Sequence, residues 1–366
     1  MTYLTNLKEI ININSYTKNK IGIDAVSMHM TQWFKELGFK NQCFTREKLG
    51  NHNLYSSPKK DGLKILFLGH NDTVFPKGEF ENYSEDEKWI YGPGVCDMKG
   101  GNIVALQALR NVYKKNGKIE NIDVFLVSDE ETGSDDSKLL TAKLAKEYDV
   151  CFVFEAAGEN LEVVTGRKGV GTFTITIHGK ASHAGVRYAE GINANLEAAH
   201  KLIELTKLTN LDIGTTVNVG KIEGGIGANT ISPSATLLLE LRYKLDSERD
   251  RLLKALEQIT NTSYVKDTKS TLSGLIQRDV MQNNKEQLTL VKKIEKITDT
   301  ILPTEERGGV SDANIVASNG VITLDGFGPF GDGDHTIHER ALKNSFEQRI
   351  NLMTVILLHH QEHKQF

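Results

Sequence analysis

The sequence has few cysteines, no excess of basic charge and no long apolar run. Its three cysteines, Cys43, Cys96 and Cys151, are odd in number and follow no pattern, which favours free thiols in a reducing cytosol over a disulfide framework. Lys and Arg number 44 against 48 Asp and Glu, so no basic field would attract nucleic acid or a membrane surface. No apolar stretch approaches the length that spans a bilayer, and residues 1–10 lack the apolar core of a signal peptide. We therefore expect a cytoplasmic protein.

The remaining composition, 39% hydrophobic and 25% charged over 366 residues, is that of a globular chain long enough for two domains. Over residues 1–165, helical and strand patterns alternate, with a helix at 28–37 and short apolar runs at 64–69, 124–128 and 150–154. After residue 282, we expect helices at 285–297 and 346–359 and a returning interior strand at 321–325.

The segment between these parts follows a different order of elements. Strand patterns at 171–178, 215–222, 235–242 and 268–276 enclose helical patterns at 193–205 and 247–259, which is a split βαβ arrangement. The predicted fold class is therefore α/β. An α/β/α domain with a mixed central sheet, residues 1–168 and 282–366, is interrupted by an inserted α+β, ferredoxin-like domain at 169–281.

Polar residues with useful chemistry follow the predicted strands. His70, Glu130 and Glu155 each stand at a strand end, where open α/β sheets bind ligands. The consecutive acids 129–131 repel one another unless a cation lies among them. Since neighbouring side chains of an extended strand point in opposite directions, Glu131 could face a metal ion while Glu130 handles a proton. Taken alone, such a run is more often a solvated turn.

Further residues strengthen the metal hypothesis. A neutral histidine such as His70 is a good zinc ligand, and Asp72 could accept its other ring N–H. Asp97 precedes two glycines and a helical pattern at 102–114, which suits a carboxylate that bridges two cations, although an acid there is often only a helix cap. His335 and His338 lie in the glycine-rich loop 331–339.

In this order along nearly the whole chain, the motifs are His70-x-Asp72, Gly-Pro-Gly-x-x-Asp97-Met-Lys-Gly-Gly, Glu130-Glu131-x-Gly-Ser, Glu155, Ser182-His183-Ala184-Gly185, Asn229, Arg242 and His335. The chain thereby resembles the di-zinc aminoacylase/carboxypeptidase family, which includes glutamate carboxypeptidase, acetylornithine deacetylase and succinyl-diaminopimelate desuccinylase. The resemblance implies two Zn²⁺ ions per chain, with Co²⁺ or Mn²⁺ as possible substitutes. It implies the following roles: Asp97 as the bridging ligand, His70 and Glu155 on one ion, Glu131 and His335 on the other, Glu130 as general acid/base, and Asp72 as the residue that orients His70.

For the inserted domain, the resemblance implies a lid that also forms a homodimer contact. His183 would stabilise the tetrahedral intermediate in a partner subunit's site, and Asn229 and Arg242 would bind the substrate. Arg278 resembles a further arginine of the folate-cleaving carboxypeptidases, although a solvated surface arginine is about equally expected there. Gly309 lies in a loop that resembles the one offering backbone N–H groups to the substrate carboxylate.

Two departures and three hypotheses follow from the resemblance. Ala156 stands where the family usually has proline, and His338 competes with His335 for the last ligand role, although Glu339 four residues after His335 fits the family spacing.

The first hypothesis is a carboxypeptidase-like zinc hydrolase that acts on a small peptide or N-acyl amino acid and releases an amino acid with a free α-carboxylate, glutamate being one candidate. The second is an N-acyl-amino-acid deacylase of the acetylornithine or succinyl-diaminopimelate type. The third, a metal-binding scaffold without turnover, is disfavoured because the catalytic acid and all ligands are present.

Overall fold

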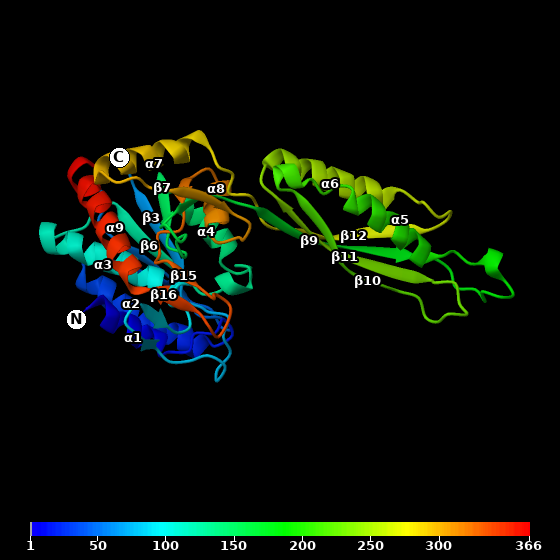
Figure 1. Cartoon of the computed structure of the whole chain (residues 1–366), viewed down its shortest axis with the longest axis horizontal. Coiled ribbons are helices and arrows are strands. Elements are labelled where there is room, and N and C mark those ends of the chain that lie inside the picture. The colour runs from blue at the N-terminus through cyan, green and yellow to red at the C-terminus, as the bar shows by residue number, and fades with distance from the viewer. Residues whose placement is uncertain (1) are drawn as a thin grey trace. The chain divides into compact units, whose positions relative to one another are not determined.

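The computed structural model describes residues 2–366, and the chain divides into two compact units (Figure 1). We call residues 2–166, 283–307 and 311–366 the main unit, and residues 167–282 with 308–310 the inserted unit. The predicted fold class is confirmed, since an α/β unit with a mixed sheet is interrupted by an α+β unit. The predicted domain limits, 1–168, 169–281 and 282–366, stay a proposal.

A six-stranded mixed sheet forms the centre of the main unit. Its order is β1 (Lys40–Phe44), β2 (His52–Ser56), β6 (Ile122–Val127), β3 (Ile65–His70), β7 (Val150–Val153) and β14 (Ile322–Leu324). The last four strands run parallel, whereas β2 pairs antiparallel with both of its neighbours, β1 and β6. Every residue of β3, β6 and β7 is buried, as expected for parallel strands covered on both faces. The prediction that β14 is an interior strand was wrong, because it lies at the end of the sheet and is buried by helices instead.

Helices surround this sheet (Figure 1). They are α1 (Tyr3–Ile11), α2 (Lys20–Glu36), α3 (Lys99–Asn116), α4 (Lys138–Ala145), α7 (Lys285–Thr298), α8 (Ala313–Ser318) and α9 (Lys343–His363). The α2 helix begins earlier than predicted because the Asn19 side chain accepts the backbone N–H of Gly22 and caps it. The α9 helix packs on α3 and α7, and its residues Phe346, Ile350 and Met353, which recur at helical spacing, are buried. Within residues 2–366, no helix combines the length and apolar character needed to cross a membrane.

Two small sheets, neither of which is predicted by a pattern in the sequence, complete the main unit. Strand β8 (Val163–Arg167) pairs with β13 (Thr304–Arg307). The other sheet has the order β15 (Gly331–Asp332), β16 (Arg340–Leu342), β5 (Trp89–Tyr91) and β4 (Ser84–Glu85). Because β16 pairs antiparallel with β5, the loop 333–339 is held beside the loop 92–97.

The inserted unit is an antiparallel sheet with two helices on one face (Figure 1). The strand order is β10 (Thr216–Gly224), β11 (Ser234–Tyr243), β9 (Gly169–His178) and β12 (Lys269–Arg278). Helices α5 (Ala194–Thr206) and α6 (Asp246–Asn261) pack on this sheet. Alternate residues such as Ile175, Leu237 and Leu239 are buried beneath them, which gives the unit its own core.

Candidate metal centre

Parallel strands bring three of the predicted ligands to one edge of the central sheet. His70 is the last residue of β3, Glu131 lies just after β6, and Glu155 follows β7 by two residues. Since β3 pairs parallel with both β6 and β7, the three carboxyl ends lie together. Asp97 and His335 reach the same place from loops.

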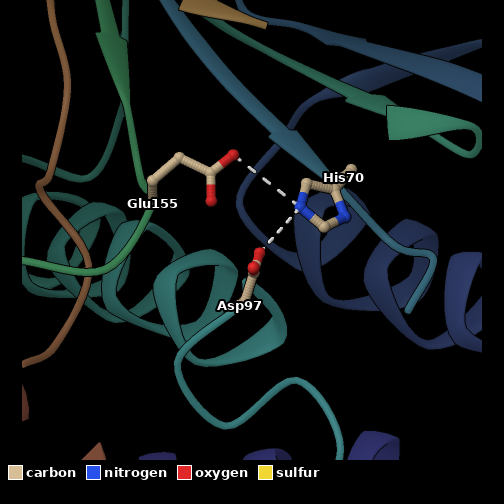
Figure 2. A group of neighbouring side chains, drawn as sticks. All are labelled: His70, Asp97 and Glu155. Atoms are coloured by element: carbon tan, nitrogen blue, oxygen red, sulfur yellow. Dashed lines mark hydrogen bonds and ion pairs between the residues drawn. The ribbon is translucent and has the colours of Figure 1, made fainter. Parts of the chain in front are cut away.

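One group consists of His70, Asp97 and Glu155 (Figure 2). The Nε2 atom of His70 lies 3.3 Å from Oδ1 of Asp97 and 3.7 Å from Oε1 of Glu155. Figure 2 shows the two carboxylates directed at the same ring nitrogen from different segments. The His70 side chain is almost completely buried, so its orientation is fixed by packing.

A second group consists of Asp97, Glu131 and His335. The Nε2 atom of His335 lies 3.2 Å from Oδ2 of Asp97 and 3.2 Å from Oε2 of Glu131. Asp97 therefore presents one carboxylate oxygen to each group. His335 lies in the left-handed backbone region, with φ of 60°, while His338 belongs to neither group in the described part of the chain. This geometry supports His335 over His338, and the assignment stays a prediction.

The spacing of these atoms fits a pair of metal ions. Ligand atoms bound tetrahedrally to zinc at about 2.0–2.1 Å are about 3.3 Å from one another. The four nitrogen–oxygen separations of the two groups span 3.2–3.7 Å. Imidazole and carboxylate are also suitable zinc ligands. The five residues could thus hold two ions that share Asp97.

The electrostatics of the cluster agree with a site for cations. Burial, together with the nearby charge of Asp97, raises the pKa of Glu131 to about 8. The same two causes raise the pKa of Glu155 well above its usual range. Hydrogen bonds to Asp97 and Glu131 raise the pKa of His335 to about 11. Protons therefore compensate the crowded carboxylates, and a bound cation would displace them.

Two glycines allow the start of α3 to approach the end of β7. A Cβ atom on Gly101 would lie 1.8 Å from the carbonyl oxygen of Phe154, and a Cβ on Gly100 would lie 1.9 Å from the carbonyl oxygen of Val95. Neither position can carry a side chain without a shift of the backbone. The absence of a side chain at Gly101 therefore brings the helix that follows Asp97 against the residue before Glu155.

Asp72 connects the end of β3 to the turn that carries the two glutamates. Its Oδ1 atom lies 3.3 Å from Nδ1 of His70, although its backbone oxygen is nearer, at 3.0 Å. The carboxylate also accepts the backbone N–H groups of Glu130 and Glu131, each at 3.3 Å, and the Thr17 hydroxyl at 2.8 Å. This arrangement supports the predicted orienting role, shared between the carboxylate and the main-chain carbonyl.

The predicted extended backbone at Glu130 and Glu131 was wrong. Strand β6 ends at Val127, and residues Glu130–Thr132 form a 3-10 turn. Hydrogen bonds from the backbone N–H groups of Thr132 and Gly133 close this turn. Glu131 belongs to a ligand group and Glu130 does not. Their different roles remain a prediction, in which the turn rather than an extended strand separates the two side chains. Asp129 instead accepts the N–H groups of Asp136 and Ser137.

Sequence reasoning missed the role of Glu339, which it used only to fix a motif spacing. The Glu339 carboxylate is buried and accepts backbone N–H groups from the loop that precedes and includes Asp97. Burial raises its pKa to about 7. The partners are 242 to 245 residues apart in sequence, so no local pattern could have revealed the contact.

The remaining predicted site residues lie in the inserted unit. His183 and Asn229 are exposed on neighbouring loops, joined by the hydrogen bond from the N–H of Ala184 to the carbonyl of Asn229. Gly309 is exposed, and its carbonyl accepts from Arg167 at 3.2 Å. The alternative that Arg278 is a solvated surface arginine was wrong, because this last residue of β12 is only 4% exposed.

Arg242 has partners within the inserted unit. Its Nε donates to Oε1 of Glu240 at 2.7 Å and its Nη2 to Oε2 at 3.3 Å, because residues two apart on a strand share a face. Its Nη1 donates to the carbonyl of Gly308 at 2.9 Å. A substrate carboxylate at Arg242 would have to compete with Glu240.

Known proteins resemble this chain over nearly its full length. Residues 165–268 match the peptidase dimerisation domain of the M20 family. Carboxypeptidase G2 of a Pseudomonas species is 29% identical, covering 91% of this chain and 83% of that protein. Succinyl-diaminopimelate desuccinylase of Helicobacter pylori is 26% identical, covering 95% and 96%.

Solved structures share the fold. The aminopeptidase PepT of Bacillus cereus superimposes with a TM-score of 0.81 at 21% identity, covering 97% of each chain. A Bacillus subtilis protein described as a dinuclear metal-binding peptidase of the M20 family superimposes with a TM-score of 0.72 at 13% identity, covering 98% of each chain.

Together, the fold, the ligand groups and these relatives define a metal-dependent hydrolase of peptide or amide bonds. The match to the M20 dimerisation domain and the similarity to these relatives confirm the predicted resemblance and the prediction of an enzyme. These relatives include a carboxypeptidase and a desuccinylase. The comparisons therefore establish the hydrolysis of a peptide or amide bond but not the substrate.

Proposed function

We propose that this protein is a di-zinc, carboxypeptidase-like hydrolase that releases an amino acid with a free α-carboxylate. The observation that carries the proposal is the pair of ligand groups that share Asp97, one with His70 and Glu155 and the other with Glu131 and His335. Zinc is favoured by the imidazole and carboxylate ligands and by the spacing of their atoms. Co²⁺ and Mn²⁺ are candidate substitutes.

The roles of the chain's own residues follow from this proposal. When bound, two metal ions would polarise the scissile carbonyl and lower the pKa of a water molecule. Glu130, next to a ligand but outside both groups, takes a proton from the attacking water and returns it to the leaving amine. Asp72 keeps the ring of His70 in the orientation that directs Nε2 at Asp97 and Glu155.

The inserted unit supplies the groups that recognise the substrate. His183 stabilises the tetrahedral intermediate, and Asn229, Arg242, Arg278 and the backbone of Gly309 bind the substrate's polar groups. An arginine fork suits a free carboxylate, and Glu240 already occupies the fork of Arg242 in the way a substrate carboxylate would. The similarity to carboxypeptidase G2 supports a carboxypeptidase reaction, and glutamate stays one candidate product on the predicted resemblance alone.

The alternative function is an N-acyl-amino-acid deacylase, supported by the similarity to succinyl-diaminopimelate desuccinylase. Both reactions hydrolyse an amide, so the metal centre is equally suited to either. The two differ only in the groups that flank the bond.

A substrate panel with the zinc-loaded protein tests the proposal. Folyl-type and N-acylglutamate substrates are compared with acetylornithine and succinyl-diaminopimelate, and release of free amino acid is measured. We expect turnover of a carboxypeptidase substrate that ceases on chelation and returns when zinc is restored. Preferred hydrolysis of acetylornithine or succinyl-diaminopimelate would establish the alternative instead. Binding without hydrolysis of any member would contradict both.

We also propose that the protein is a cytoplasmic homodimer that associates through the inserted unit. The match to a peptidase dimerisation domain supports this, as do the exposed apolar side chains of Leu196 and Ile203 on α5, seven residues apart, and of Ile222 on the edge strand β10. Light scattering should give twice the chain mass. Replacement of Leu196 and Ile203 by lysine should give monomers, whereas an unchanged mass would exclude this face.

A further inference from the structure

We propose that Glu339 is a positioning residue that fixes Asp97 for both metal groups at once. This inference rests on the proposed function, because it assigns a purpose to a residue that touches neither substrate nor metal. A carboxylate that bridges two ions must be placed precisely, because each of its oxygens serves a different ion. The hydrogen bonds of Glu339 provide that placement.

The first observation is the set of hydrogen bonds around the Glu339 carboxylate. Its Oε1 accepts the backbone N–H of Cys96 at 3.0 Å and that of Asp97 at 3.1 Å. Its Oε2 accepts the backbone N–H of Gly94 at 2.9 Å. The Sγ of Cys96 also donates to Oε1, at 3.4 Å. Three converging N–H groups on one carboxylate are charge-assisted bonds, which are stronger than bonds between neutral groups.

The second observation is the shape of the loop that these bonds hold. Gly94 has φ of 84°, in the left-handed region that glycine adopts without strain, so its N–H can turn toward Glu339. The carboxylate of Glu339 is buried, so water does not compete for these N–H groups. Glu339 thus holds the backbone N–H of Asp97 directly, and the carboxylate oxygens that face the two groups belong to that same residue.

The third observation is that Glu339 also belongs to the segment that carries His335. Its backbone N–H donates to the carbonyl of Thr336, and its own carbonyl accepts the N–H of Gly92. The pairing of β16 with β5 begins at the next residue, Arg340. Glu339 therefore joins the loop of the bridging ligand to the loop of the last ligand, through both its side chain and its backbone.

These contacts lead to a consequence that a merely structural residue would not have. If Glu339 fixes the bridging carboxylate, the loss of Glu339 weakens the binding of both ions together, because each group uses one oxygen of Asp97. Partners that orient metal ligands typically contribute about 10–100-fold to metal affinity. A residue that only stabilises the fold would lower the melting temperature and leave the affinity of the folded molecules unchanged.

The test uses two variants of the full-length protein. Glu339→Gln keeps the size of the side chain but replaces one acceptor oxygen by an NH₂ group, so at least one of the three N–H groups loses its acceptor. Glu339→Asp keeps the charge but is shorter by one methylene and cannot reach all three N–H groups in the same way. The second variant separates position from charge, and it carries the test if the first does not fold.

Asp123→Asn is the matched control. Asp123 is a buried carboxylate in the main unit that accepts the backbone N–H of Ser57 at 2.9 Å and the Tyr148 hydroxyl at 2.6 Å. It lies near the start of β6, at the opposite end of that strand from Glu131. Its substitution should destabilise the fold to a similar degree without moving Asp97.

Three readouts decide the matter: the affinity of both ions by competition with a chromophoric chelator, the visible spectrum of the Co²⁺-loaded protein, and the melting temperature of the metal-free protein. We expect both Glu339 variants to bind each ion about 10–100-fold more weakly and to show an altered Co²⁺ spectrum. The Asp123→Asn control should keep the wild-type affinities and spectrum.

If either Glu339 variant kept the wild-type metal affinities and Co²⁺ spectrum, the inference would be overturned. If only Glu339→Asp kept them, the charge of the side chain rather than its position would be what matters. If the wild-type protein itself bound no metal ion in the same titration, the proposed function would fail instead. The two failures are therefore distinguishable.

Discussion

Replacing Gly101 by alanine tests whether close packing of α3 against the end of β7 builds the metal centre. The new Cβ would lie 1.8 Å from the carbonyl oxygen of Phe154, whereas real Cβ atoms essentially never approach within 3.0 Å. The helix start or the strand end must therefore move by at least 1.2 Å. The neighbouring atom is backbone, so no side-chain rotation can relieve the contact.

This displacement is large on the scale of metal coordination. Metal–ligand distances tolerate a deviation of about 0.2 Å, so a movement of 1.2 Å exceeds that tolerance about sixfold. Because α3 follows Asp97 and Phe154 precedes Glu155, the shift separates ligands of the same group. We expect overpacking to lower the free energy of unfolding by about 1–3 kcal/mol. The affinity for the ion between His70, Asp97 and Glu155 should fall by more than tenfold.

Chelator competition measures the affinity, and chemical denaturation of the metal-free protein measures the stability. Ala145→Val is the matched control, since it adds volume at a buried position of α4, a helix that carries none of the proposed ligands. It should cost stability and leave metal affinity unchanged. If Gly101→Ala folds and binds two ions as tightly as the wild type, the packing of α3 does not set the geometry of the site.

Three further predictions concern the reaction itself. Glu130→Gln should lower kcat by about 10²–10⁴-fold while metal analysis still finds two ions per chain, and a near-normal kcat would remove Glu130 from the mechanism. His183→Ala should lose most activity with metal content intact, and an unaffected kcat/KM would show that the lid histidine does not act in the reaction. Glu240→Ala should free the guanidinium of Arg242 and lower the KM for carboxylate-bearing substrates, whereas Arg242→Ala should raise this KM. Equal KM values in both variants would exclude Arg242 as the residue that binds the substrate carboxylate.

The sequence predicted the parts of the fold that have strong local patterns. The runs that became β3, β6 and β7 are short, apolar and bounded by polar residues, so they indicated buried parallel strands and the edge where His70 and Glu155 meet. The strands β15, β16, β5 and β4 have only two or three residues each and carry no such pattern. The small sheet that supports the loop of His335 was therefore missed.

The errors at the site have a similar origin. Residues 129–131 continue an apolar run, and sequence alone does not reveal that hydrogen bonds to Asp129 and Glu130 close a turn there. Arg278 ends an edge strand with an exposed pattern, yet its own side chain is buried. The contacts of Glu339 depend on the pairing of β16 with β5, which joins residues about 250 positions apart and has no local signal.

The order of the ligands along the chain has a consequence for biosynthesis. His70, Asp97 and Glu155 all precede the inserted unit, whereas His335 follows it, 180 residues after Glu155. Domains tend to fold as units while the chain emerges from the ribosome. The first ligand group is thus synthesised in full before the inserted unit exists, but the second must wait until the chain has completed that unit and returned to the main one. A nascent chain stopped within the inserted unit contains only one complete group of proposed ligands, so the proposed binuclear centre is among the last features of the molecule to be completed.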